Sequence, residues 1–314
     1  MDPAYSIIVF TTASGAGYGL LVLVSLLAIS GALPPTTGLG LAAIGAPAAL
    51  IAAGLSSSAL HLGRPERALG AFSQWRSSWL AREGVAAVAT FAPLGVFGIG
   101  WVFFNDVGGF FAGMAAACAL LALLTISCTA MIYASLKPIQ QWRNGFVLPA
   151  YLALGLYTGS LLLVLLTRMF GVYRPAFALL AVVLLGLAWA IKWGYWRHID
   201  AAPTQISLGA ATGLGRLAEV RLLESPHTEA NFIMREMGYE IARAHARKLR
   251  AIAHVALFLA PLALLGIVAA GPPILAQLAA LAAVLSAALG VAVERWLFFA
   301  EARHVSMVFY DRAG

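Results

Sequence analysis

Hydrophobic residues in this chain run in long stretches without charge, separated by short polar connections. After Asp2 the next charged residue is Arg64, and the later uncharged stretches are 84–105, 107–136, 144–167, 175–191 and 251–293. A bilayer core of about 30 Å needs roughly 20 apolar residues as helix, so each short stretch holds one span. The stretches 3–63 and 251–293 hold two each, because Gly- and Pro-rich turn signals interrupt them at 31–38 and 271–273. The pattern predicts eight spans: 5–31, 39–61, 84–104, 109–136, 147–168, 176–196, 251–270 and 274–298.

Composition supports the same fold class. Of the 314 residues, 61% are hydrophobic and only 11% are charged, whereas a soluble domain carries roughly 25% charge. A membrane barrel would show alternating strands of about ten residues instead. We therefore predict an all-α polytopic membrane protein with one membrane-anchor domain over 1–314. Gly15 and Gly19 have the four-residue spacing that allows close helix packing, although the chain is rich in Gly throughout.

Basic residues are distributed unequally between the two sides of the predicted membrane domain. Eighteen Lys and Arg residues lie at or beyond one set of span ends, and only Arg168 and Arg174 lie on the other side. Cytoplasmic loops are enriched in Lys and Arg, so we read the net charge of +7 as membrane orientation and not as nucleic-acid binding. Both termini are then cytoplasmic, in a bacterial inner membrane. No Lys or Arg precedes the first apolar run, so we expect no cleavable signal peptide.

The largest segment outside the predicted spans is 199–250. Its first part is rich in Gly, Ala and Thr and reads as loop, and its second part, from about Thr228, reads as helix. Apolar residues there alternate with four cations that could face a partner: Arg235, Arg243, Arg247 and Lys248. Two interpretations remain open: a basic amphipathic helix at anionic headgroups, and a docking surface for a cytoplasmic partner.

Polar residues at the edge of the second and third spans are the strongest candidates for chemistry. His61 ends the second span and Glu83 begins the third, so an antiparallel pair of spans would bring them together. An imidazole titrates near neutral pH, and a carboxyl in an apolar setting takes up protons more readily than in water, so the pair could bind and protonate a quinone. Arg64 and Arg82 could instead hold Glu83 ionised. In the structural alternative, these residues are interfacial caps and snorkelling cations.

Other polar residues at this membrane edge have weaker signals. Tyr133, Lys137 and Trp142 match an aromatic belt, and together with Ser78 they could line a quinone entrance or a partner surface. His254 lies just inside the seventh span, but no paired-histidine pattern supports a haem, so we expect none. Cys118 and Cys128 lie in one span and read as small core residues. The spacing of these residues predicts no metal site.

Several runs resemble one family. "SALHLGRPERA" (58–68) and "SSWLAREG" (77–84) resemble the membrane anchor subunits of the dimethyl sulfoxide reductase family, in which such a histidine run ends the second span and a Glu begins the third. "MIYASLKPIQQWRN" (131–144) and "NFIMREMGYEIARAHARKLR" (231–250) are similar to a subgroup that accompanies cytoplasmic sulfite dehydrogenases. The resemblance covers essentially the whole chain and fits the eight predicted spans.

The resemblance implies a function and a set of partners. A molybdopterin catalytic subunit and an iron–sulfur subunit would sit on this anchor, whose own chain binds quinone or quinol but no covalent cofactor and no haem b. The family's quinol-site histidine corresponds to His61 and its essential carboxylate to Glu83. The predicted cytoplasmic face favours the sulfite-oxidising branch. The alternatives are a quinol-oxidising anchor of a terminal reductase, a purely structural anchor, and a transporter, for which the spans show almost no buried charge.

Overall fold

The computed structural model describes residues 4–59, 70, 72–201, 207–221, 223–224 and 241–309, and of 241–244 the backbone alone. Within these residues the elements are all helical, and an isolated bridge between Ile139 and His304 is the single trace of strand pairing. Eight of the helices are long and apolar enough to cross a membrane. The predicted fold class, an all-α polytopic membrane protein, is confirmed.

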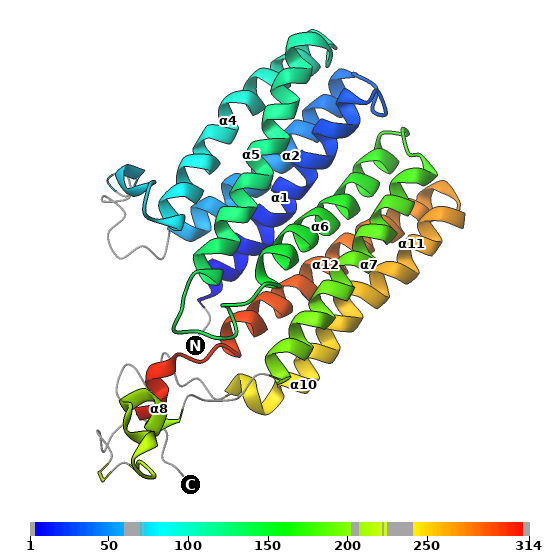
Figure 1. Cartoon of the computed structure of the whole chain (residues 1–314). Coiled ribbons are helices and arrows are strands. Elements are labelled where there is room, and N and C mark those ends of the chain that lie inside the picture. The colour runs from blue at the N-terminus through cyan, green and yellow to red at the C-terminus, as the bar shows by residue number, and fades with distance from the viewer. Residues whose placement is uncertain are drawn as a thin grey trace.

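Seven spans are single helices, and the seventh in chain order is a composite (Figure 1). The single helices are α1 (Tyr5–Ile29), α2 (Thr37–Ala59), α4 (Trp79–Phe103), α5 (Gly109–Ala134), α6 (Val147–Met169), α7 (Pro175–Ala201) and α12 (Pro273–Ala300). The composite joins α10 (Ile241–Ala253), the π-helical segment η4 (His254–Leu259) and α11 (Ala260–Ala270). The short helices are η2 (Phe72–Gln74), α8 (Leu208–Thr212), η3 (Leu214–Arg216) and η5 (Val305–Phe309).

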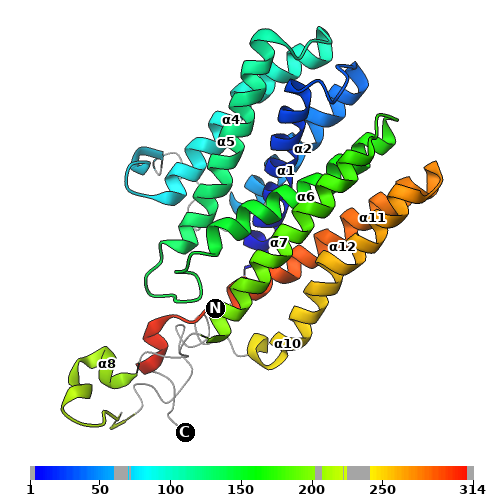
Figure 2. The same ribbon diagram turned by 45° about the vertical axis from the view of Figure 1, so that its right-hand side comes forward.

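The bundle consists of two groups of helices. Helices α1, α2, α4 and α5 form one group, and α6, α7, α11 and α12 form the other, with α1 packed on α6 between them (Figures 1 and 2). Short turns close one end of the bundle, and η2, α8 and η5 lie at the opposite end (Figure 1). All the sizeable described segments outside the spans therefore lie at a single end.

The contact between α1 and α6 depends on glycine. A Cβ atom at Gly19 would lie 1.8 Å from the carbonyl oxygen of Gly155, and one at Gly159 would lie 2.3 Å from the amide nitrogen of Leu20. Such backbone contact is how small residues drive helix association in a bilayer, where the hydrophobic effect between helices is absent. Gly15 contributes its carbonyl oxygen, which faces Gly155, but its own Cβ position is open. The close approach anticipated from the Gly15 and Gly19 spacing is thus made mainly by Gly19.

Several helices extend beyond the uncharged stretches of the sequence. Helix α4 begins at Trp79, five residues before the predicted span, because Ser78 caps it by accepting a hydrogen bond from the amide of Ala81 at 3.4 Å. Helices α7 and α12 likewise continue to Ala201 and Ala300. The extensions bring charged side chains inside the helices. The basic helix predicted from about Thr228 falls largely outside the described residues, which show its end as α10.

Gly19→Ala tests the α1–α6 contact. We expect the variant to lower the thermal unfolding temperature of the detergent-solubilised protein by several degrees, or to prevent its accumulation in membranes, because the added methyl overlaps backbone atoms that cannot move aside. Gly45→Ala on α2 is the matched control, since a Cβ there meets no atom within 4 Å. Equal unfolding temperatures for the two variants would contradict the packing described.

Candidate functional site

Glu83 lies on α4, four residues after its start, and its side chain is only 4% exposed. The carboxyl group points into the bundle, where Oε1 is hydrogen-bonded to the hydroxyl of Thr129 on α5. Thr129 lies five residues before the end of its helix, so both groups are about 6–8 Å from the helix ends. Burying an ionisable group at this depth costs free energy. Its presence therefore makes Glu83 a candidate for function.

The hydroxyl of Thr129 has two partners but one hydrogen. Its Oγ1 contacts both Glu83 and, at 3.0 Å, the backbone carbonyl of Thr125. A carboxylate and a carbonyl both accept, so the hydroxyl can donate to one of them at a time. When Glu83 carries a proton, it can donate to Thr129, which donates to Thr125; when Glu83 is ionised, Thr129 can donate to it instead. The site accommodates both protonation states without moving a helix.

Arg82 is directed away from Glu83. Its Nε donates to the carbonyl of Trp75 at 2.9 Å and its Nη2 to the carbonyl of Arg76 at 2.6 Å, while its guanidinium lies 4.3 Å from the ring centre of Trp79. Arg82 therefore fastens the segment that precedes α4. The structure does not bring Arg82 and Glu83 together.

Two further residues of the sequence-predicted site, His61 and Arg64, lie outside the described residues. Phe72, from the described part of the same connection, packs against Gly84, where a Cβ would lie 2.6 Å from its ring. The connection between α2 and α4 thus returns to the start of α4 next to Glu83.

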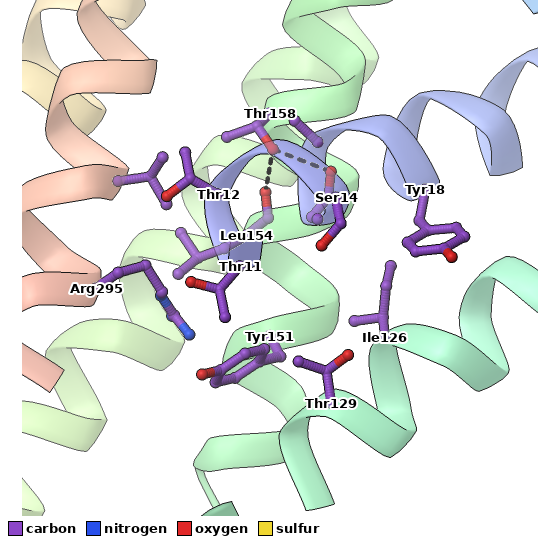
Figure 3. A pocket seen from close by; sticks show the side chains of 14 residues that line it. Thr11, Thr12, Ser14, Tyr18, Ile126, Thr129, Tyr151, Leu154, Thr158 and Arg295 are labelled. Atoms are coloured by element: carbon purple, nitrogen blue, oxygen red, sulfur yellow. Dashed lines mark hydrogen bonds between the residues drawn. The ribbon is translucent and has the colours of Figure 1, made fainter. Parts of the chain in front are cut away.

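A polar pocket adjoins Thr129. It lies among α1, α5, α6 and α12, and its cavity volume is about 20 Å³, which is room for about one water molecule (Figure 3). Thr129 contributes to its wall, so Glu83 and the pocket share that side chain. The other polar side chains around it come from three helices: Thr11, Thr12, Ser14 and Tyr18 of α1, Tyr151 and Thr158 of α6, and Arg295 of α12.

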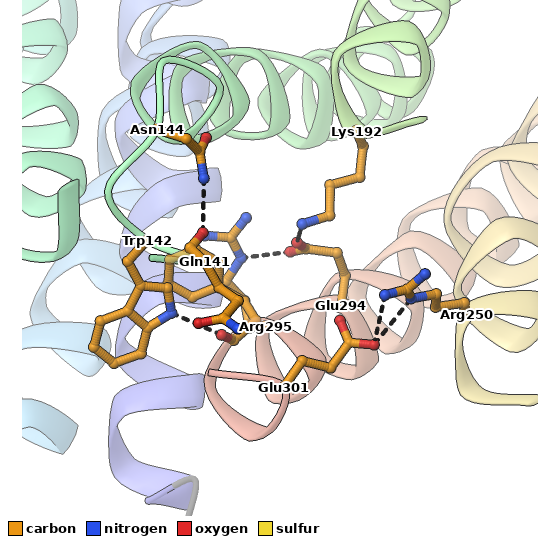
Figure 4. Close-up of polar contacts among 9 residues, drawn as sticks. Gln141, Trp142, Asn144, Lys192, Arg250, Glu294, Arg295 and Glu301 are labelled. Atoms are coloured by element: carbon orange, nitrogen blue, oxygen red, sulfur yellow. Dashed lines mark hydrogen bonds and ion pairs between the residues drawn. The ribbon is translucent and has the colours of Figure 1, made fainter. Parts of the chain in front are cut away.

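Three charged side chains are buried together beside this pocket. Lys192 of α7 forms an ion pair with Glu294 of α12, and the second carboxylate oxygen of Glu294 accepts from Nε of Arg295 at 2.5 Å (Figure 4). None of the three is more than 2% exposed. Arg295 also lies 4.0 Å from the ring centre of Tyr151. Buried charges need such pairing, because an unpartnered ion away from water is strongly destabilising.

The sequence analysis counted Lys192 and Arg295 among the cations at or beyond the span ends on the cytoplasmic side, but both are buried and do not belong in that count. Both lie inside long helices and point into the protein. The signal that could have identified them was available, because Glu294 and Arg295 fall within the predicted span 274–298 and charges inside a span mark function by default. Nothing in the sequence indicated that Lys192 was their partner.

A second set of ion pairs closes the same end of the bundle nearer its surface. Arg250 of α10 binds Asp200 of α7 at 2.7 Å and Glu301, which follows α12, at 2.9 Å. Burial raises the pKa of Glu301, although Arg250 opposes this shift. These contacts join α10 to the ends of α7 and α12 and so support the position of the buried ion pairs, which lie about two turns deeper.

Tyr133 and Trp142 belong to an aromatic cluster. The rings of Tyr133 and Trp142 are 5.2 Å apart, and Tyr133 also stacks on Tyr151 at 6.0 Å. Trp142 is buried and its indole donates to the carbonyl of Phe298 at 2.8 Å. The cluster therefore packs behind the pocket wall formed by Tyr151, whereas Lys137 is exposed.

The remaining candidates lie away from the pocket. His254 accepts a hydrogen bond on Nδ1 from the indole of Trp189 at 3.0 Å, which joins α7 to the composite seventh span. Cys118 and Cys128 are buried and free. Of the four cations proposed for docking, Arg247 and Lys248 are exposed on α10; Arg235 lies outside the described residues, as does the side chain of Arg243.

Comparison with known proteins places this arrangement in a family. A family model described as DMSO reductase anchor subunit (DmsC) matches residues 1–301. The chain is 32% identical to a sulfite dehydrogenase subunit of Allochromatium vinosum, and the match covers 99% of each protein. No solved structure matches the chain at a significant level. With eight apolar helices and a family match over nearly its whole length, the chain belongs to the DMSO reductase anchor subunits.

Proposed function

We propose that this subunit is the quinone-reactive membrane anchor of a sulfite-oxidising complex, passing electrons from an iron–sulfur subunit to membrane quinone. The observation that carries the proposal is the buried carboxyl of Glu83, which shares Thr129 with a polar pocket near one end of the bundle. A purely structural anchor would need neither a buried proton-exchanging group nor a pocket beside it.

The chemistry requires two electrons and two protons for each quinone reduced to quinol. Electrons arrive from a partner subunit, and Glu83 supplies a proton to the reduced ring through the Thr129 hydroxyl, which can donate in one state and accept in the other. Glu83 then regains a proton from the side at which α4 begins. The resemblance of the 58–68 run to the family motif assigns a second proton-exchanging role to His61.

The partners are a molybdopterin catalytic subunit and an iron–sulfur subunit, which hold the metal cofactors and sit on the cytoplasmic face. The relative from Allochromatium vinosum is named as part of a sulfite dehydrogenase, which supports the sulfite branch. After removal of Lys192 and Arg295 from the count, sixteen cations remain on this side against two on the other, which favours the cytoplasm by the positive-inside rule. Electrons and protons then enter from the same side, so the step moves no charge across the membrane.

Glu83→Gln tests the role of the carboxyl. We expect sulfite-dependent quinone reduction to fall by about 100-fold or more, because general acid catalysis typically contributes that much, while sulfite oxidation with a soluble artificial acceptor stays normal. We expect His61→Ala to lower quinone reduction in the same way and to leave sulfite oxidation with the artificial acceptor normal. Activities are measured on purified complex in which the presence of every subunit has been verified.

Glu219→Gln is the matched control, because this carboxylate is exposed and paired only with Arg221 in the described part of the chain. Full quinone turnover in Glu83→Gln would remove the assigned proton donor. A loss of both activities together would indicate failed assembly and would favour the structural anchor.

The orientation can be tested with cysteines placed at the two ends of the bundle. Ser73→Cys, in exposed η2, should react with a membrane-impermeant maleimide only in inside-out vesicles, whereas Ser30→Cys, in the exposed turn after α1, should react in right-side-out spheroplasts. The native cysteines give little background because both are buried. The reverse labelling pattern would place the partners and the proton supply on the periplasmic face.

A further inference from the structure

An apolar groove opens at the end of the bundle where α1 begins and α12 ends (Figure 1). Three helices supply its walls: Tyr5 and Ile8 of α1, Leu249 of α10, and Ala292, Val293 and Trp296 of α12. Its cavity volume is about 300 Å³, and the walls consist almost entirely of hydrocarbon. Ordered water in such a space would need several polar partners. The groove therefore suits an apolar chain.

The groove begins at the level of the lipid headgroups and continues among the acyl chains. Tyr5 is the first residue of α1, and Trp296 lies four residues before the last residue of α12. Ala292 lies eight residues before that end, which is about 12 Å along the helix axis. Tyr and Trp gather at the boundary between membrane and water, so these two side chains mark the outer part of the groove.

Lys248 lies at the outer rim of the groove. It directly precedes Leu249 in α10 and is exposed. Arg250, on the other flank of Leu249, points inward to Asp200 and Glu301. Successive helix residues are about 100° apart, so Lys248 lies on the outward flank of the helix. Helical side chains lean towards the N-terminus, which here directs the ammonium group to the headgroups.

The charge of Lys248 is available to a molecule outside the protein. Within the described part of the chain no carboxylate is paired with it, whereas Arg250 has two. A cation at the cytoplasmic membrane surface attracts lipids with a net negative charge. The sequence left the basic segment that ends in α10 open between anionic headgroups and a protein partner. At Lys248, beside an apolar groove that enters the membrane, the headgroup interpretation is the better supported.

We propose that this groove binds an anionic phospholipid. One acyl chain lies along Ile8, Ala292 and Val293, and the phosphate lies at the level of Tyr5, beside Lys248. The lipid then contacts both helix groups, since α1 belongs to one and α12 to the other. Glu83 is not part of the lining, so the lipid site is separate from the quinone role of the subunit.

Trp296 reports on the occupant of the groove, because bromine atoms on a lipid chain quench tryptophan fluorescence on contact. The purified complex is placed in phosphatidylcholine nanodiscs that contain an increasing share of brominated phosphatidylglycerol or brominated phosphatidylcholine. The quenching that Trp296→Phe removes arises in the groove. We expect it to reach half its maximum at an about 5-fold lower share of the anionic lipid, since one cation at the surface strengthens binding by about that factor.

Lys248→Gln tests the source of this preference. We expect the variant to lose the preference for phosphatidylglycerol and to keep the wild-type unfolding temperature, because the side chain is exposed. Arg247→Gln is the matched control: this cation is also exposed but lies about 160° around α10 from Leu249, away from the groove. Equal effects of the two changes would contradict the assignment of Lys248.

The apolar part of the site is tested by filling it. Ala292→Phe should raise the share of either brominated lipid needed for half-maximal quenching severalfold, because the added ring occupies the groove. Ala282→Phe is the control, since Ala282 is exposed on the same helix and is not part of the lining. Inorganic phosphate should displace the lipid no better than chloride at equal ionic strength, because it has no chain; specific displacement by phosphate would overturn the proposal.

Three results in the wild-type complex would also overturn the lipid site. Equal quenching by both brominated lipids would show ordinary bilayer lipid without selection. An absence of any quenching that depends on Trp296 would show that protein covers the groove. Relief of the quenching by added quinone would assign the groove to quinone. None of these results bears on Glu83→Gln, so the lipid site and the proposed function can fail independently.

Discussion

The backbone contact of α1 with α6 is the constraint on which the rest of this membrane domain depends. Without a Cβ at Gly19 or Gly159, the two helices approach until backbone atoms touch, and two groups of four helices become one bundle. The same contact sets the polar face of α1, with Thr11 and Ser14, opposite Tyr151 and Arg295 (Figure 3). Close packing in this region therefore does more than stabilise the fold, because it creates the polar pocket between the groups.

Most buried polar side chains in the bundle have hydrogen-bond or ion-pair partners within the protein, which gives them a structural role. In an interior that excludes water, almost every polar side chain needs a protein partner. Glu294 finds two cations, Trp142 finds a carbonyl, and the α1 and α6 hydroxyls donate back to their own helices.

The carboxyl of Glu83 and the polar pocket both adjoin the side chain of Thr129. Thr129 contacts Glu83 on one side and lines the pocket on the other. The charged network on α7 and α12 borders the pocket through Arg295, whose Nε is paired with Glu294 (Figure 4). Thr129, the partner of Glu83, and Arg295 thus reach one pocket from different helix groups.

The sequence by itself determined the all-α class, the eight helices and the family, because the bilayer imposes long uncharged runs and the family motif lies within a short stretch of chain. It did not determine helix ends, since caps such as Ser78 and neutralising partners extend helices beyond the apolar pattern. Only the tertiary structure decided that Lys192 and Arg295 are buried, that Arg82 turns away from Glu83, and that four helices share a pocket. The reason is physical: a charge at a span end has the same sequence signature whether it meets headgroups or a partner more than a hundred residues away, and helix packing alone distinguishes the two.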